Sequence, residues 1–251
     1  MTDATGGRSR GGYSGDVVVA VDISGSTLDV GLVTMQGELI DRDGVEVDHH
    51  LQADALFASL RAVIDAQVER ARSHHRLRPA AVGVGSSGPV TRDVEAVSPV
   101  NISAWRNFPL RERLAMATTL PVFGDTDAKA LALAEGWLGA AQGRDSFLAI
   151  VVSTGVAGGI VVNGQLLEGA EGNAGHVGHI TVEPNGRRCA CGARGCLEAE
   201  ASGLAVEAIT GRPHTSPTYE IMQRTGRLVG RAAASVCNLL DLDLEIGRAH
   251  V

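Results

Sequence analysis

One histidine and three cysteines lie close together in the sequence and have the side chains that bind zinc. The four candidate ligands are His179, Cys189, Cys191 and Cys196. One imidazole and three thiolates make a complete tetrahedral set, which leaves no open position for a substrate and indicates a structural Zn²⁺ rather than a catalytic one. His176 is a fifth candidate for four places, so we assign it to the substrate pocket instead.

A polar turn between two apolar runs near the start of the chain has groups that suit a phosphate and its metal ion. Asp22 can orient a hydrated Mg²⁺, and Gly25 permits close approach of a ligand to the backbone. The hydroxyl and backbone N–H groups of Ser26 and Thr27 can hold phosphate oxygens. A polar hairpin turn without any ligand is the alternative, and this motif by itself fits both interpretations.

A second glycine-containing turn lies in the other half of the chain. Its candidate phosphate-binding residues are Thr154, Gly155, Gly158 and Gly159. Two such turns in separate halves predict a cleft that closes on a nucleotide. The alternative is a hairpin in which the glycines serve only to allow positive φ.

Two aspartates lie between a short apolar run and a helical segment. Asp125 and Asp127 flank Thr126 at this point, and a carboxylate at the carboxyl end of a strand faces the crevice of an α/β sheet. One of the two aspartates is therefore a candidate general base. Helix N-capping, which Asp performs well, is the alternative.

The elements that must position these groups alternate between strands and helices. Short apolar runs predict strands over residues 17–20, 28–33, 80–85 and 120–123, with two more joined by a turn within 146–167. Helical periodicity and composition predict helices over residues 53–72, 129–138, 197–209 and 219–240. The alternation predicts an α/β protein.

Charge and composition exclude several classes of partner. The 251 residues contain 22 Lys and Arg against 29 Asp and Glu, and the formal net charge of −7 would repel a phosphate backbone. Residues 1–15 mix Gly, Ser, Thr and Arg without an apolar core, which predicts a disordered tail and not a signal peptide. Three cysteines are clustered and Cys237 lies apart, so they form no disulfide framework and indicate the reducing cytoplasm. We expect neither a nucleic-acid partner nor a membrane partner.

The motifs in this order resemble the ROK family of sugar kinases and sugar-responsive repressors, within the hexokinase, actin and Hsp70-like ATPase superfamily. The resemblance extends from about Asp16 to Leu244 and is most specific in residues 169–179 and 189–198. It implies a two-domain actin-like ATPase (ribonuclease H-like) α/β fold with a structural zinc loop. The implied domains are an N-terminal one at 16–122 with the first phosphate turn, and a C-terminal one at 123–244 with the second.

By the same resemblance, the expected activity is that of an ATP-dependent hexose kinase, similar to glucokinases, that uses Mg²⁺ and ATP, with polyphosphate as an alternative donor. Asp127 is the implied general base, which accepts the proton of the sugar hydroxyl as that oxygen attacks the γ-phosphoryl group. The implied sugar contacts are Asn101, Thr126, His176, His179 and Glu198. The implied nucleotide- and phosphate-binding residues are Asp22, Gly25, Ser26, Thr27, Thr154, Gly155, Gly158 and Gly159. The expected partners are a sugar and a nucleotide, and the full-length protein is expected to form a homo-oligomer.

Several positions depart from the family pattern, among them Ser24 and Ser153, which replace the first glycine of the two phosphate turns. Thr126 and Lys129 stand where the family has asparagines, and His176 stands where active kinases have glutamate. These changes alter the hydrogen bonding near the base. They favour, as the alternative function, a catalytically weak sugar-binding protein or a sugar-responsive transcriptional regulator.

The end of the chain also departs from the pattern. Residues 239–244 resemble the beginning of another buried strand, and the chain stops seven residues later. Residues 245–251 match the translation of a common sequencing adapter. We therefore expect a non-native tail and an incomplete C-terminal domain.

Overall fold

The alternating valines of the first apolar run form a central strand in a computed structural model, which describes residues 14–249. β1 (Gly15–Ile23) buries Val17, Val19 and Val21, because successive side chains of a strand point to opposite faces of the sheet. Residues 1–13 of the tail expected at 1–15 lie outside the described part of the chain. Gly15, which was also expected in the tail, is the first residue of β1.

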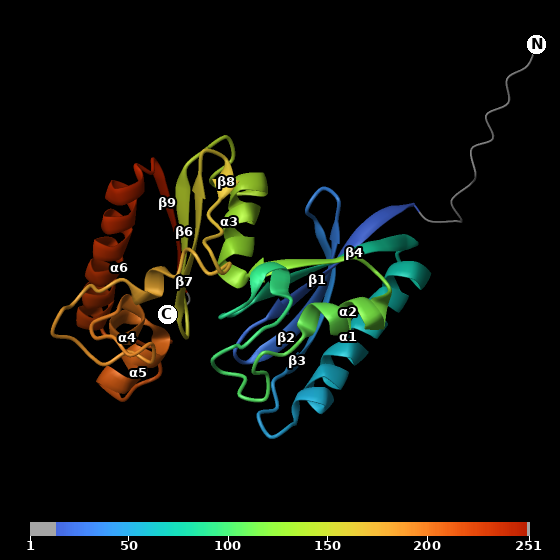
Figure 1. Cartoon of the computed structure of the whole chain (residues 1–251), viewed down its shortest axis with the longest axis horizontal. Coiled ribbons are helices and arrows are strands. Elements are labelled where there is room, and N and C mark those ends of the chain that lie inside the picture. The colour runs from blue at the N-terminus through green and yellow to red at the C-terminus, as the bar shows by residue number, and fades with distance from the viewer. Residues whose placement is uncertain (1–13, 250–251) are drawn as a thin grey trace, which may run out of the picture. The chain divides into compact units, whose positions relative to one another are not determined.

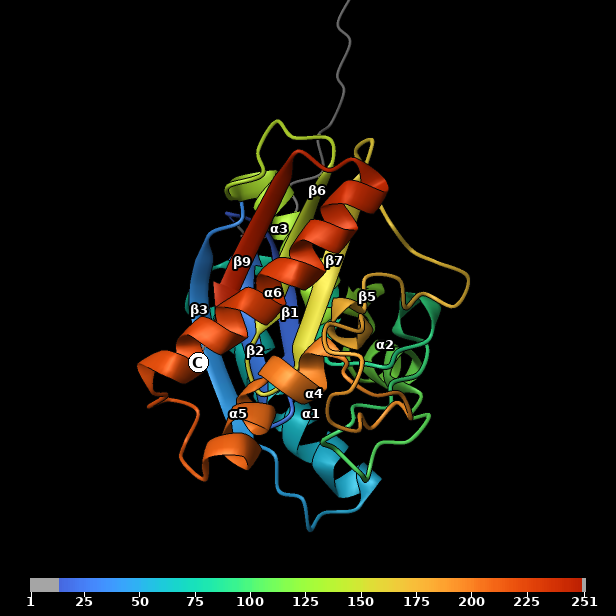
Figure 2. The same ribbon diagram turned by 90° about the vertical axis from the view of Figure 1, so that its left-hand side faces the viewer.

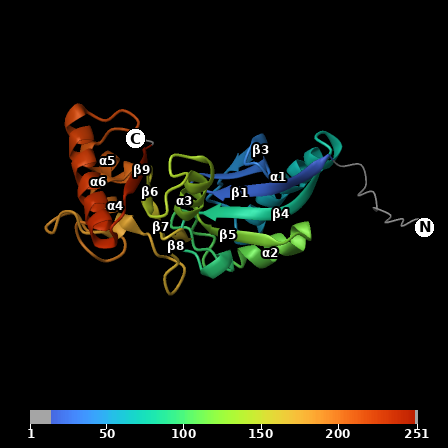
Figure 3. The ribbon, with the colours of Figure 1, turned by 90° about the horizontal axis from the view of Figure 1, so that it is seen from above.

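The first sheet has five strands in the order β3-β2-β1-β4-β5. Figure 3 shows β1, β4 and β5 side by side. Its remaining strands are β2 (Thr27–Thr34), β3 (Leu39–Glu46), β4 (Leu77–Ser86) and β5 (Val122–Thr126). β1, β2 and β3 form an antiparallel meander, and α1 (Ala53–Ser73) packs against these three strands. α1 also contacts α2 (Leu110–Thr118).

The second sheet has four strands in the order β8-β7-β6-β9. These strands are β6 (Phe147–Val152), β7 (Val156–Val162), β8 (Gln165–Leu166) and β9 (Leu244–Ala249). Its helices are α3 (Asp127–Leu138), α4 (Leu197–Ala201), α5 (Gly203–Thr210) and α6 (Tyr219–Leu240). α3 and α6 cover opposite faces of the sheet (Figures 1 and 2).

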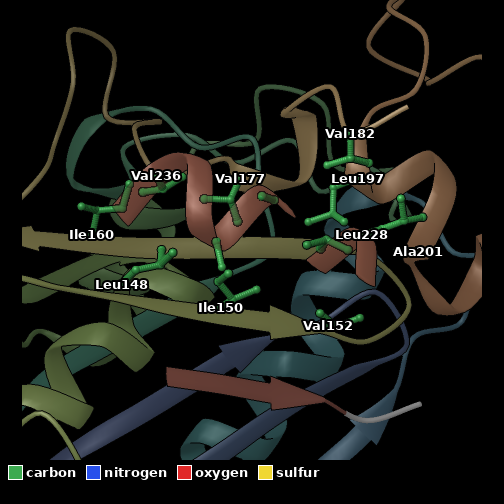
Figure 4. Packing of buried hydrophobic residues seen from close by; sticks show 13 residues of the cluster. Leu148, Ile150, Val152, Ile160, Val177, Val182, Leu197, Ala201, Leu228 and Val236 are labelled. Carbon is green, nitrogen blue, oxygen red and sulfur yellow. The ribbon is translucent and has the colours of Figure 1, made fainter. Parts of the chain in front are cut away.

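β6 is buried on both faces, and its side chains alternate between the two cores. Leu148 and Ile150 pack with Leu228 and other residues of α6, as Figure 4 shows. Phe147 and Ala149 point to the other face and pack with α3. A strand covered by helices on both sides needs a continuous apolar run, which explains the sequence of this segment.

The two sheets repeat one topology. In each of them, three antiparallel strands follow one another, and a later strand lies beside the first of the three. β6 therefore corresponds to β1, and β7 corresponds to β2. The two candidate phosphate turns, which connect β1 to β2 and β6 to β7, occupy equivalent places in the two sheets.

The residues divide into two compact units along this repeat. The first unit comprises the chain up to Val84 together with Val94–Gly124, and the second comprises Gly85–Asp93 together with the chain from Asp125. The domains expected at 16–122 and 123–244 differ from these units chiefly at residues 85–93, which join the second unit.

Most of the predicted elements are confirmed, with a few corrections. The helices expected at 53–72 and 219–240 are α1 and α6, whereas the one expected at 197–209 is divided at Ser202 into α4 and α5. The strand expected from residue 239 begins only at Leu244, because α6 continues to Leu240. The polar strand β3 and the helix α2 were not predicted.

β9 includes residues that the sequence analysis assigns to a non-native tail. It pairs in parallel with β6 from Leu244 to Ala249. This pairing uses backbone groups that every residue except proline has, so it is independent of where the residues originate. Residues 250–251 lie outside the described part of the chain, and the assignment to a tail stays a prediction.

Within residues 14–249, no helix combines the length and the apolar character that a membrane span requires.

We expect Gly159→Ala to lower the free energy of unfolding by about 1–3 kcal/mol, the usual range for overpacking a core. A Cβ at this position of β7 would lie 2.6 Å from the carbonyl oxygen of Ala128 and 2.6 Å from the Cβ of Ala132 in α3. Denaturant unfolding measures the change. Gly226→Ala in α6 is the control, because nothing lies within 4 Å of its Cβ, and it should stabilise the helix by about 0.5–1 kcal/mol. A neutral Gly159→Ala would contradict the close packing of α3 on β7.

Candidate functional site

The first candidate phosphate turn is held together by a serine side chain. The Oγ of Ser24 accepts hydrogen bonds from the backbone N–H groups of Ser26 (3.3 Å) and Thr27 (3.0 Å). It also lies 2.9 Å from the Oγ1 of Thr27. The turn is therefore formed without a ligand, and a phosphate that binds these N–H groups must replace or share the hydroxyl of Ser24.

Asn101, an implied sugar contact, lies directly against this turn. A Cβ on Gly25 would lie 2.5 Å from the Nδ2 and 3.0 Å from the Cβ of Asn101, so a larger residue at position 25 would displace the Asn101 side chain. The loop of Asn101 is organised by Arg106, which donates hydrogen bonds to four backbone carbonyls. The acceptors are the carbonyl oxygens of Pro99, Val100, Ile102 and Trp105, at 2.8–3.1 Å.

Asp22 lies opposite another carboxylate. Its cross-strand partner in β2 is Asp29, which forms a 3.0 Å ion pair with Arg42. Although Asp22 is exposed, the surrounding protein raises the pKa of its carboxyl group, and the negative charge of Asp29 raises it further, whereas Arg42 lowers it. A cation near Asp22 would relieve this repulsion.

The candidate general base begins α3 but does not cap it. The N-cap is Thr126, whose Oγ1 accepts a 3.4 Å hydrogen bond from the N–H of Lys129. Asp127 is the first helical residue, and its Oδ1 accepts a 2.7 Å bond from the N–H of Ala128. Capping by an aspartate, the alternative that the sequence left open, is thus not what this turn uses. Thr126 is only 4% exposed and is committed to the cap.

The second candidate phosphate turn contains only part of the predicted set. Thr154 and Gly155 lie in the turn, whereas Gly158 and Gly159 lie inside β7 and pair with β6. The placement of these two glycines in a loop was wrong, since both serve close packing: a Cβ on Gly158 would lie 2.8 Å from Val177.

Glu198, an implied sugar contact, supports the second turn. Its Oε2 accepts a 3.1 Å hydrogen bond from the N–H of Val156, and it would lie 3.1 Å from a Cβ on Gly155. Glu198 lies in the first turn of α4. One of its oxygens is thus occupied by the backbone of the turn.

Lys129 joins the first turn of α3 to the glycine-rich loop. Its side chain is completely buried, and its Nζ lies 2.8 Å from the carbonyl oxygen of Gly172 and 3.2 Å from carboxylate oxygens of Asp125 and Glu168. Burial raises the pKa of Asp125, against the lowering effect of the N–H of Thr126 and of the lysine charge. Because its Oδ2 lies 3.2 Å from the ammonium group, Asp125 is an ion-pair partner of Lys129.

His176 lies beside the cap of α3. A Cβ on Gly88 would lie 3.3 Å from the Nε2 of His176 and 3.9 Å from the Cγ2 of Thr126. Burial lowers the pKa of His176, and His179 lowers it further, against the raising effect of Glu198. This lowering favours the neutral imidazole, which can both donate and accept a hydrogen bond.

The four predicted zinc ligands come together in space. Their ligand atoms all lie within 4.8 Å of one another, and Cys189 Sγ to His179 Nδ1 and Cys191 Sγ to Cys196 Sγ are each 3.7 Å apart. A tetrahedron with Zn–S bonds of about 2.3 Å has edges of about 3.8 Å. The donor set and its spacing therefore fit a zinc ion.

Two of the thiols differ in how readily they lose a proton. The N–H of Ala193 lowers the pKa of Cys191, whereas burial raises the pKa of Cys196 to about 12. Buried thiols without a cation favour the protonated form, and a bound metal ion reverses that preference.

A buried carboxylate holds the cysteine loop onto the helices. Glu200 of α4 is 2% exposed, pairs with Arg224 of α6 and accepts a 2.5 Å hydrogen bond from the N–H of Arg187. The sequence alone gave no sign of this role.

The candidate residues fall into two groups, one on each unit. The first unit contains Asp22, Gly25, Ser26, Thr27 and Asn101, and the second contains the other candidates. Sequence reasoning missed Asn173, which exchanges two hydrogen bonds with the backbone of Val90. It also missed the buried contacts of Lys129, for which the only signal was that a lysine stands where the family has an asparagine.

Comparison with known proteins identifies the relatives of this chain. The model of the ROK family matches residues 18–246. A glucokinase from Halalkalibacterium halodurans is 38% identical over 195 residues, which cover 76% of this chain and 58% of the relative. An N-acetylmannosamine kinase from Yersinia pestis is 34% identical over 91% of this chain and 80% of its own length. The chain thus spans less than two thirds of the glucokinase that it matches.

Solved structures share the fold. A ROK family glucokinase from Streptomyces griseus, in complex with glucose and AMPPNP, is 28% identical with a TM-score of 0.75 over 93% of this chain and 83% of that one. A ROK family transcriptional regulator, a homolog of the E. coli MLC protein, is 27% identical with a TM-score of 0.80 over 94% of this chain and 65% of that one. With a family match over nearly the whole described chain and the same α/β fold, this protein belongs to the ROK family.

Proposed function

We propose that this protein is an ATP-dependent sugar kinase of the glucokinase type, which transfers the γ-phosphoryl group of ATP to a hydroxyl group of a hexose. The observation that carries the proposal is the local arrangement around α3. Thr126, and not Asp127, is the N-cap of α3, and the loop that bears His176 is fastened to the same turn. The named relatives and the glucokinase complex support this assignment.

In the proposed reaction, Asp127 accepts the proton of the sugar hydroxyl. The sugar oxygen forms a bond to the γ-phosphorus, the bond from that phosphorus to the bridging oxygen breaks, and ADP leaves with the electron pair. Carboxylate catalysis of this kind contributes about 10²- to 10⁴-fold. Asn101, His176, His179 and Glu198 are the proposed sugar contacts, with Thr126 acting through the cap that orients Asp127.

The two equivalent turns are the proposed nucleotide-binding elements. The first, with Asp22, Gly25, Ser26 and Thr27, would hold phosphate oxygens and a hydrated Mg²⁺. The second contributes Thr154 and Gly155, while Gly158 and Gly159 act indirectly by packing β7. Mg²⁺ would neutralise the charge that develops on the phosphates.

Zinc is proposed as a structural ion held by His179, Cys189, Cys191 and Cys196. When bound, it would supply a rigid crosslink and no reactive position, since the four ligands complete its shell. Its effect on function would come through His179 and through α4, which begins directly after Cys196 and bears Glu198.

A second candidate function is sugar binding without phosphoryl transfer. It is favoured by His176, an imidazole where active kinases have a carboxylate, and by the similarity to a transcriptional regulator. Calorimetric titration detects the sugar binding that both functions share, and an assay of ADP release separates them, because only the kinase releases ADP.

Asp127→Asn should lower kcat by about 10²- to 10⁴-fold, since the amide cannot accept the proton. A coupled assay of ADP release over a panel of hexoses and N-acetylhexosamines measures the loss. Asp145→Asn, an exposed aspartate of the same unit, is the matched control and should leave turnover unchanged. Full activity in Asp127→Asn would remove this residue as the base, whereas sugar binding without ADP release in the unsubstituted protein would favour the second candidate.

Zinc removal by a strong chelator should release one equivalent of metal and lower the unfolding temperature by about 5 °C or more. Cys191→Ser should produce the same metal-poor protein, because a serine hydroxyl replaces a thiolate ligand. Cys237→Ser is the control, since this partly buried cysteine lies on α6 outside the cluster. Protein that is purified without zinc and is insensitive to the chelator would disprove the site.

Asp22→Asn should weaken the binding of MgATP at least tenfold and slightly stabilise the protein at neutral pH. Because the folded protein raises the pKa of Asp22, its ionised form opposes folding above that pKa. The gain is less than about 1 kcal/mol, since solvent screens an exposed charge, and it should disappear as the pH falls below the ordinary pKa of aspartate. Unfolding curves at pH values from about 3 to about 8, a range that includes the ordinary pKa of aspartate, measure this gain in stability. A stability gain that persists at low pH would contradict the charge effect.

A further inference from the structure

Lys129 is the only lysine in the chain. All the other basic side chains among the 22 Lys and Arg are arginines. Lys129 is also completely buried, which is rare for a charged side chain unless it is paired. A lysine at this one position points to a requirement that arginine does not meet.

The surroundings of its ammonium group explain the requirement. Its Nζ lies 2.8 Å from the carbonyl oxygen of Gly172, 3.2 Å from Asp125 Oδ2 and 3.2 Å from Glu168 Oε2, with the carbonyl oxygen of Glu168 at 3.5 Å. These acceptors converge on one point, which suits a compact group with three rotatable donors. A planar guanidinium is larger and spreads its donors in a fixed fork.

The contact joins two segments that are far apart in the sequence. One is the start of α3, with Asp127, and the other is the glycine-rich loop 168–175, which leads into His176. Gly175 of this loop is pressed against β7, where a Cβ would lie 2.5 Å from the carbonyl oxygen of Gly158. The position of His176 relative to Asp127 therefore depends on how the loop is held.

The loop has a second fastening on its exposed side. Arg92 donates to the carbonyl oxygens of Gly169 and Ala170, each at 3.3 Å. Arg92 is exposed, so water can replace these bonds at little cost, whereas no water reaches the buried ammonium of Lys129. Lys129 and Arg92 thus hold the same loop, one buried and the other exposed to water, and variants of the two residues can be compared directly.

We propose that Lys129 is a positioning residue that clamps loop 168–175 to the first turn of α3 and thereby sets the place of His176 beside Asp127. The consequence for activity rests on the proposed kinase function, while the clamp itself does not. Lys129 touches neither the sugar nor the phosphate in this proposal. It acts by fixing the loop before the substrate arrives.

The clamp can be observed directly, because labelling with ¹⁵N-lysine marks a single side chain. We expect one ammonium signal whose protons exchange slowly with water, and an amine that reacts with acylating reagents only after unfolding. Hydrogen exchange of the amides in residues 169–176 should accelerate in Lys129→Met and stay nearly unchanged in Arg92→Met. Rapid ammonium exchange, or equal effects of the two variants, would overturn the clamp.

Kinetics of the same variants test its role in catalysis. Lys129→Met should lower kcat/KM about 10- to 100-fold in the folded protein, the effect expected from a small misplacement of reacting groups, and Arg92→Met should change it less than about threefold. Lys129→Arg should fail to rescue activity despite its charge. An unchanged kcat/KM in folded Lys129→Met would overturn the positioning role.

A triple variant guards against a simple failure to fold. Combining Lys129→Met with Asp125→Asn and Glu168→Gln removes both carboxylate partners, of which the mostly buried Asp125 would otherwise keep an unpaired charge. It should recover the unfolding temperature without recovering slow exchange in the loop or kcat/KM. Recovery of both would mean that the lysine only balances charge. If the unsubstituted protein turns over no sugar, the proposed kinase function fails, while ammonium exchange and loop exchange still decide the clamp.

Discussion

The close approach of β7 to its neighbours on both sides is the constraint on which the second unit depends. Gly158 admits Val177 and the backbone of Gly175 to one face, and Gly159 admits the backbone of α3 to the other. Any side chain at these positions would separate the helix or the loop from the strand. The strand is thus the reference against which Asp127 and His176 are placed, although neither glycine contacts a substrate in the proposed mechanism.

Buried charged side chains fix the loops that this packing leaves unattached. Lys129 and Glu200 are each almost or completely inaccessible, and each is paired with an opposite charge and with backbone groups of a loop. Apolar packing holds helices and strands well but cannot hold a glycine-rich loop, which has few side chains to bury. Hydrogen bonds from a buried ion to the loop backbone perform that task, because in a low dielectric they are strong and directional.

The repeated topology explains why two similar turns occur in one chain. Each turn connects the first two strands of a meander, so the same fold places the same kind of turn twice. The two turns are nevertheless stabilised differently. In the first turn, Ser24 accepts the hydrogen bond from the N–H of Thr27. In the second, the N–H of Val156 is bound by Glu198 of α4.

The sequence by itself determined the alternation of strands and helices, the clustering of the four candidate metal ligands and the place of Asp125 and Asp127 at the junction of a strand and a helix. These features depend on periodicity and on local spacing, which are properties of short segments. It missed β3, because this edge strand is polar and largely exposed, and it misread Gly158 and Gly159 as loop residues. Only the tertiary structure decided what those glycines touch, that Thr126 rather than an aspartate caps α3, and that the single lysine fastens a loop some forty residues away in sequence. Such roles depend on which distant segments the fold brings together, and no short stretch of sequence contains that information.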